Sequence, residues 1–222
     1  MLQLLQFPWS PFCLVQRRIL EYSRAPHHIV NIPPGDRSLI WKETRQRYYQ
    51  VPVLKDGKNV LFETEEASQV IAKYLESKLQ LGLFPRELEG VQNIIWENIE
   101  NEVEAVTFKL NDSRYKDFVP KGEQLNYLRY KERKFGKGCL KQWAEQQRLL
   151  QKRLAEKLLP YEQMLGNRPF LLDGHPTFVD FDLWGMLANF LYSGKFKLPA
   201  SRPRIKAWYG KMTNLKIDKS SK

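Results

Sequence analysis

The pattern of hydrophobic and polar positions changes character once along the chain. Over the first 79 residues, short apolar runs of strand length alternate with stretches of helical periodicity. The pattern predicts strands at 2–7, 28–32, 52–55 and 60–63, and helices at 12–24, 38–46 and 65–79. The turn sequence around Gly57 joins the last two strands as a tight hairpin. The predicted order is βαβαββα, with a right-handed parallel crossover between the first two strands.

Beyond this region the periodic segments are all helical. Apolar residues recur at helical spacing over 88–110, 140–165 and 179–192, and Pro160 should kink or end the second of these helices. Thr177 and Asp180 have the spacing of a capping box at the start of the last one. We therefore expect an α/β domain at 1–79, a linker at 80–88 and an all-α helical domain at 89–222.

The boundary between the first strand and the first helix is the first candidate for chemistry. Ser10 followed by Pro11 is typical of an N-cap and a first helical residue, because proline has no amide hydrogen to leave unpaired. This places Ser10 and Cys13 at a helix N-terminus, where partial positive charge and free amides stabilise an anion. A thiolate, from a ligand or from Cys13 itself, would be favoured there.

Two further positions along the chain could contact a ligand. Pro52 opens a strand, and a cis peptide bond between Val51 and Pro52 would expose the Val51 amide and carbonyl. From the residues alone an ordinary trans bond is favoured, since roughly one X–Pro bond in twenty is cis. Glu63 and Thr64 lie between a strand and a helix, where Thr64 could cap the helix and Glu63 could pair with an ammonium group. Together they would suit the head of an amino acid, although from this pair alone a plain capped helix is the favoured explanation.

Composition narrows the class of protein. The 222 residues carry a formal charge of +11, and Cys13 and Cys139 form neither a disulfide framework nor a paired metal motif. No apolar run reaches the roughly 20 residues of a membrane helix. We expect a protein of the cytoplasm with no membrane partner and no metal. The charge favours a solvated basic surface over nucleic-acid binding, since no zinc-finger or RNA-binding motif accompanies it.

The order of elements and these motifs resemble the cytosolic glutathione S-transferase family over essentially the whole chain. The run from Ser10 to Phe12 is similar to the serine-type motif of the plant tau class, and a bacterial-type member is expected. The resemblance implies a thioredoxin-like domain with a cis Val51-Pro52 turn, a helical second domain, a homodimer and glutathione as co-substrate. The glutathione-binding residues that it implies are Arg37, Gln50, Val51, Glu63 and Thr64, with Lys42 as a spare partner for the glycyl carboxylate.

The implied activity is conjugation of glutathione to small, largely apolar electrophiles, with Ser10 as the catalytic residue that donates a hydrogen bond to the thiolate. Tyr115, Phe118 and Trp184 are possible substrate contacts by their aromatic character. A thiol-disulfide oxidoreductase is one alternative, because the run ending in Cys13 also resembles a glutaredoxin motif whose first cysteine is replaced by serine. Peroxidase or isomerase activity and a non-catalytic binding module are the others.

Overall fold

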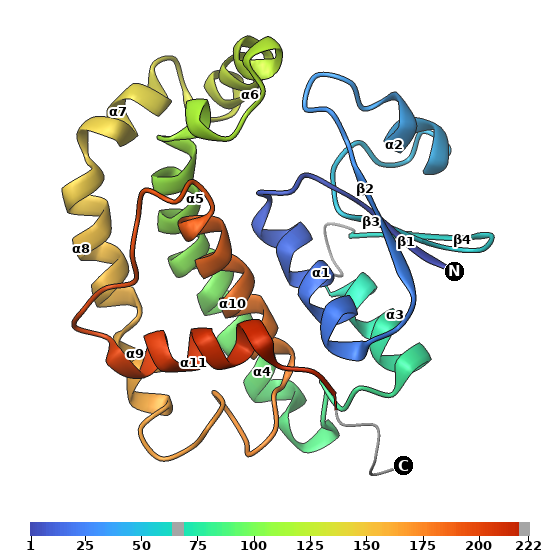
Figure 1. Cartoon of the computed structure of the whole chain (residues 1–222), viewed down its shortest axis with the longest axis vertical. Coiled ribbons are helices and arrows are strands. Elements are labelled where there is room, and N and C mark those ends of the chain that lie inside the picture. Colours follow the sequence, from blue (N-terminus) through green and yellow to red (C-terminus); the bar gives the residue numbers. More distant parts are fainter. Residues whose placement is uncertain (64–68, 218–222) are drawn as a thin grey trace.

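The first part of the chain folds as a four-stranded sheet with helices. The computed structural model describes residues 1–63 and 69–217, and Figure 1 shows the sheet beside a larger body of helices. The elements follow the predicted order: β1 (Leu2–Gln6), α1 (Pro11–Ser23), β2 (His27–Asn31), α2 (Ser38–Glu43), β3 (Val53–Asp56), β4 (Asn59–Phe62) and α3 (Val70–Leu79).

The sheet has the strand order β2-β1-β3-β4. β1 pairs parallel with β2 and antiparallel with β3, and the hairpin pairs β3 with β4. Side chains of β1 alternate between two cores, as a pleated strand requires. Leu4 packs into the large core that α1 shares with the helices, whereas Leu5 packs into a smaller core with Ile40 of α2. The predicted thioredoxin-like domain is confirmed.

The rest of the described chain is helical, and the predicted helices are more broken than expected. The stretch 88–110 contains α4, a π-helical segment and α5, because one π turn interrupts the α-helical hydrogen bonding. The stretch 140–165 contains α7, α8 and α9, with Pro160 in the first turn of α9. We did not predict α6 or α11. The segments are η1 (Arg86–Leu88), α4 (Glu89–Asn98), η2 (Ile99–Glu104, the π-helical segment), α5 (Ala105–Asp112), η3 (Tyr115–Asp117), η4 (Lys121–Glu123), α6 (Gln124–Phe135), α7 (Cys139–Glu145), α8 (Gln147–Lys157), α9 (Leu159–Met164), α10 (Phe178–Leu191) and α11 (Pro203–Asn214).

Helix α10 is the centre of the molecule, and every residue from Phe178 to Phe190 is buried. Its predicted capping box is present: the Thr177 amide donates to the Asp180 carboxylate at 2.9 Å, and the Thr177 side chain accepts from the backbone of Asp180. In Figure 1, α10 lies beside α1, which separates it from the sheet. The approach is close because Gly185 has no side chain; a Cβ there would lie 3.0 Å from the Pro11 carbonyl oxygen.

The segment between α3 and α4 is held in place by hydrogen bonds. The Glu76 carboxylate accepts from the amides of Gly82 and Leu83, at 3.1 and 2.8 Å, and the Leu83 carbonyl accepts from the Phe178 amide at 2.9 Å. We propose residues 80–88 as the boundary between the two domains. None of the helices described here is both long enough and apolar enough to cross a membrane.

Candidate active site

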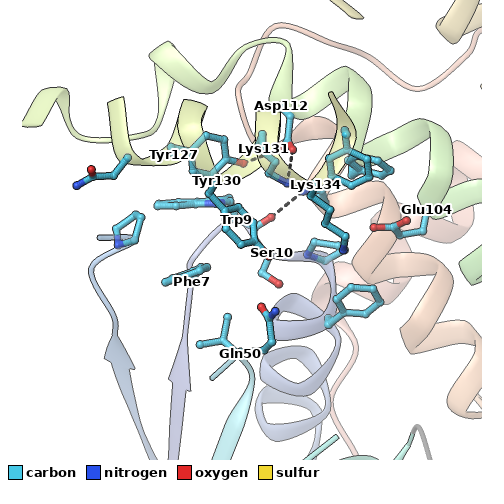
Figure 2. A pocket seen from close by; sticks show the side chains of 18 of the residues that line it. Phe7, Trp9, Ser10, Gln50, Glu104, Asp112, Tyr127, Tyr130, Lys131 and Lys134 are labelled. Atoms are coloured by element: carbon cyan, nitrogen blue, oxygen red, sulfur yellow. Dashed lines mark hydrogen bonds and ion pairs between the residues drawn. The ribbon is translucent and has the colours of Figure 1, made fainter. Parts of the chain in front are cut away.

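The start of α1 borders a cavity of about 160 Å³, which we call the Ser10 cavity. Ser10, Arg37, Gln50 and Val51 all line it, so the structure brings together four of the six predicted site residues. They come from the β1–α1 turn, the start of α2 and the loop before β3. Figure 2 shows the Ser10 side chain pointing into this space, with Gln50 on the side of the sheet and charged side chains opposite.

Ser10 occupies the N-cap position of α1, as predicted, with Pro11 as the first helical residue. Its amide donates to the Phe7 carbonyl at 3.1 Å, and the Asn189 side chain of α10 donates to the Trp9 carbonyl at 2.7 Å. The turn is therefore held by both halves of the chain. The Ser10 hydroxyl forms no capping bond to the helix backbone. It lines the cavity beside amides that carry partial positive charge.

Arg37 supplies a positive charge to the same cavity. Its guanidinium donates to the Tyr49 carbonyl at 2.9 Å and to the Gln50 side chain at 3.1 Å. It also lies over the rings of Phe7 and Tyr130, 4.8 and 5.2 Å from their centroids. No carboxylate in the described part of the chain forms an ion pair with it. Arg37 is thus a buried, oriented cation that can bind an anion. Lys42, the spare candidate, is exposed and does not line this cavity.

The Val51-Pro52 peptide bond is cis, as the family resemblance implied. Val51 also borders a second cavity of about 200 Å³, which is lined in part by Phe12 as the first is, and which we call the Glu63 cavity. The Glu63 carboxylate lines it and accepts from the amides of Val70 and Ile71, at 2.9 and 3.2 Å. Glu63 itself therefore caps α3, and burial raises its pKa. Thr64 lies outside the described residues.

The wall opposite Ser10 was missed from the sequence because α6 was missed. Tyr127, Tyr130, Lys131 and Lys134 lie on one face of α6 and line the Ser10 cavity (Figure 2). Lys131 pairs with Asp112 of α5 at 2.5 Å. The spacing of these four residues is that of a helix face, but from the sequence their charges were assigned only to a solvated basic surface.

The cavity is also lined by a carboxyl group that is a weaker acid than usual. Glu104, the last residue of the π-helical segment, lines the Ser10 cavity, and burial raises its pKa to about 7 although Lys131 and Lys134 act in the opposite direction. At neutral pH this group is partly protonated. None of the aromatic residues that we had suggested as substrate contacts lines this cavity. Tyr115 and Phe118 pack against Tyr127 and Trp9 of its wall, and Trp184 donates to Thr213 in α11. Phe108 and Phe135 line the cavity instead.

Cys13 does not face either cavity. Its side chain is fully buried, and burial raises the pKa of its thiol to about 12, against smaller lowering effects from Ser10, Phe7 and Arg37. Such a thiol is almost entirely protonated at neutral pH and is a poor nucleophile. Of the two residues at the helix start, Ser10 is the one that can contact a ligand.

Comparison with known families identifies the two parts of the fold. Residues 4–80 match the model of the glutathione S-transferase N-terminal domain, and residues 141–211 match that of the C-terminal domain. Together the two matches span two thirds of the chain. The chain belongs to the glutathione S-transferase family. A search of curated proteins with this sequence found no match.

Solved structures show the same fold. The protein is similar to glutathione transferase GSTFuA3 from Phanerochaete chrysosporium, with 18% identity, a TM-score of 0.80 and 96% of each chain covered. It is also similar to poplar glutathione transferase F1, with 20% identity, a TM-score of 0.66 and 96% and 92% coverage. Glutaredoxin 2 from Salmonella typhimurium, solved in complex with glutathione, has 18% identity, a TM-score of 0.72 and 96% and 94% coverage. At these identities the likeness establishes the fold alone.

Proposed function

We propose that this protein binds glutathione across the Ser10 and Glu63 cavities and conjugates it, through its sulfur atom, to small electrophiles. The observation that carries the proposal is the position of the Ser10 hydroxyl. It lies at the N-terminus of α1, forms no capping bond, and lines a cavity that also contains Arg37 and Gln50. Family membership supplies glutathione as the ligand that such a site would bind.

The two cavities suggest how glutathione would be oriented. Arg37 and Gln50 would bind the glycyl carboxylate, and the backbone of Val51 would pair with the cysteinyl residue. Because Val51 borders both cavities, the γ-glutamyl end would extend into the Glu63 cavity. The sulfur would then lie beside Ser10. The electrophile would bind against the rings of Phe108 and Phe135 on the helical side.

Ser10 would act by stabilising the thiolate. A hydrogen bond to a charged group contributes about 1.5–3 kcal/mol net, and each pKa unit corresponds to about 1.36 kcal/mol, so the glutathione thiol could be acidified by roughly one to two units. Its proton would pass to solvent. The thiolate would then attack an electrophilic carbon, forming the carbon–sulfur bond as the leaving group departs with its electron pair.

The structure weighs against thiol exchange through Cys13. A glutaredoxin-type reaction needs an exposed, acidic thiol at the helix start. This chain has a hydroxyl at that position, and Cys13, three residues later, is buried with a raised pKa.

The test is the Ser10→Ala variant, with Cys13→Ser as the matched control. We expect Ser10→Ala to lower kcat/KM with an aryl halide by about 10- to 100-fold, the equivalent of the lost hydrogen bond. Glutathione should still bind within about twofold, since its peptide ends contact other residues. The ultraviolet absorbance of bound thiolate, titrated against pH, measures the same loss without any electrophile. Unchanged turnover and an unchanged thiol pKa in Ser10→Ala would refute the assignment of Ser10.

A further inference from the structure

A large basic cavity adjoins the Ser10 cavity. It has a volume of about 600 Å³ and lies between the loop from β2 to α2 and helix α6, two segments that face each other in Figure 1. We call it the Arg133 cavity. The loop approaches α6 closely, because a Cβ at Gly35 would lie 2.7 Å from the side-chain nitrogen of Asn126. Four residues line both cavities: Pro34, Arg37, Asn126 and Tyr130.

Positive charge dominates the wall of this cavity. Arg129 and Arg133 lie four residues apart on one face of α6, and Lys137 follows shortly after the helix ends. All three residues are exposed, and none of their side chains forms an ion pair or a hydrogen bond within the described chain. Arg37 adds a fourth cation from the opposite side. Glu132, the one carboxylate among the described lining residues, already accepts from a backbone amide at 2.8 Å.

The shape of the cavity separates it from an ordinary solvated surface. A cleft lined by charges of one sign concentrates the electric field and raises the local concentration of counter-ions. Binding sites for small molecules occupy roughly 300–1,000 Å³, and the Arg133 cavity lies within this range. Arg129 and Arg133 also repel each other, since like charges four residues apart destabilise a helix, and an anion bound beside them would relieve this repulsion. These features favour a small anionic ligand.

We propose that the Arg133 cavity binds a small molecule that carries a chain of phosphoryl groups. The forked guanidinium groups of Arg129 and Arg133 can each pair two N–H donors with two phosphate oxygens, and Lys137 supplies a further point charge. A single phosphate group could contact only part of this set, whereas a chain of two or three reaches more of it. A nucleoside triphosphate and inorganic tripolyphosphate share this chemistry. The cations surround one cavity instead of following a stripe along the surface, which favours such a molecule over a nucleic-acid strand.

Arg37 links this cavity to the glutathione site, and this part of the inference rests on the proposed function. Its guanidinium borders both cavities and already donates to the Tyr49 carbonyl and to the Gln50 side chain. A phosphoryl group beside Arg37 would compete with the glycyl carboxylate for the remaining donors and would repel that carboxylate. Bound polyphosphate should therefore weaken the binding of glutathione while the chemistry at Ser10 proceeds unchanged.

The first test is calorimetric titration of the full chain with tripolyphosphate in the absence of metal ions. We expect one site per chain and binding at least about 10-fold tighter than that of orthophosphate, because each additional hydrogen bond between charged groups contributes about tenfold. The double variant Arg129→Gln/Arg133→Gln should lose at least about 10-fold in affinity. The control is Arg148→Gln/Lys152→Gln on α8, which removes the same charge at the same spacing from exposed residues that line neither this cavity nor the Ser10 cavity. Both pairs are exposed, so both double variants should unfold near the wild-type temperature.

Titrations with ATP and with adenosine identify the source of the phosphate chain. ATP that binds as tightly as tripolyphosphate would show that the phosphate chain alone is recognised, and ATP that binds more tightly would identify a nucleotide as the ligand. Adenosine, which has no phosphate group, should not bind in either case. A short single-stranded RNA without terminal phosphates that bound more tightly than both would overturn the inference in favour of a nucleic-acid surface.

The second test is steady-state conjugation of an aryl halide at varied glutathione concentration. Tripolyphosphate should raise the KM for glutathione at least about fivefold in wild type, leave kcat unchanged, and change neither in Arg129→Gln/Arg133→Gln at the same concentration. An unchanged KM in wild type would overturn the link through Arg37. Absence of tripolyphosphate binding, or an equal loss of affinity in both double variants, would overturn the site itself. Binding of tripolyphosphate by a chain that does not bind glutathione would refute the proposed function and leave the site in the Arg133 cavity standing.

Discussion

Replacing Gly185 by alanine tests how closely the two halves of the site must pack. A Cβ at this position would lie 2.4 Å from Cγ2 of Val15 and 3.0 Å from both the Val15 amide nitrogen and the Pro11 carbonyl oxygen. Carbon atoms at optimal separation lie about 3.5–4.0 Å apart, so α1 and α10 would have to separate by about 1 Å. The valine cannot rotate away, because its χ1 is restricted in a helix.

The expected loss of stability follows from two opposed effects. Overpacking a close contact costs about 1–3 kcal/mol, and the backbone contacts here place this site at the upper end. Alanine regains about 1 kcal/mol over glycine in a helix interior. The net loss is about 2 kcal/mol, which for a chain of this length lowers the melting temperature by about 4–8 °C. Moving α1 would also displace the Ser10 hydroxyl, so kcat/KM with an aryl halide should fall.

Gly210→Ala is the matched control. Gly210 is an exposed position inside α11, and its Cβ would meet no described atom within 4 Å. There the helix propensity acts alone, and we expect about 0.5–1 kcal/mol of stabilisation. Urea unfolding of both variants, followed by circular dichroism, measures the two free energies. If Gly185→Ala proved as stable as Gly210→Ala, the close packing of α1 on α10 would be wrong.

Two further predictions concern titrating groups. Both cysteines are buried and burial raises the pKa of each thiol. At pH 8 the native protein should therefore react with a thiol-specific reagent only at the rate at which it unfolds, whereas in urea two thiols should react at once. One fast-reacting thiol in the native protein would refute this prediction. Burial raises the pKa of Glu100 and of Glu104 from 4.5 to about 7, so between these values the folded state keeps protons that the unfolded chain has released. The free energy of unfolding should therefore fall as pH rises from 5 to 8, by on the order of 2 kcal/mol per group. Glu100→Gln and Glu104→Gln should each make this dependence on pH weaker. A free energy of unfolding that rose over this range would contradict the raised pKa values.

Much of the fold could be predicted because its signals are local. The start of α1 at Pro11 and the capping box of Thr177 and Asp180 depend on residues within one helical turn of each other. The order of strands and helices in the first domain follows from short periodic runs. The π-helical segment could not be predicted in this way, because its residues keep ordinary helical spacing.

The candidate site was predictable only on the side of the sheet. Ser10, Arg37, Gln50 and Val51 could be named from the sequence, and the structure places them around one cavity. The opposite wall belongs to α6, which approaches the site only through the packing of the second domain. We assigned its lysines to a solvated basic surface because sequence periodicity does not say what a helix face contacts.

By itself, the sequence determined the order of strands and helices in the first domain and the starts of α1 and α10. It also determined that a serine and a cysteine lie at a helix N-terminus, and which family the chain resembles. The tertiary structure decided that Cys13 is buried, that Glu63 caps α3, and that Asp182 and Gln16 line one cavity. The physical reason is the separation along the chain over which each interaction acts. Caps and periodicity act over a few residues, whereas burial and pairing depend on which distant helices pack together, here α1 against α10.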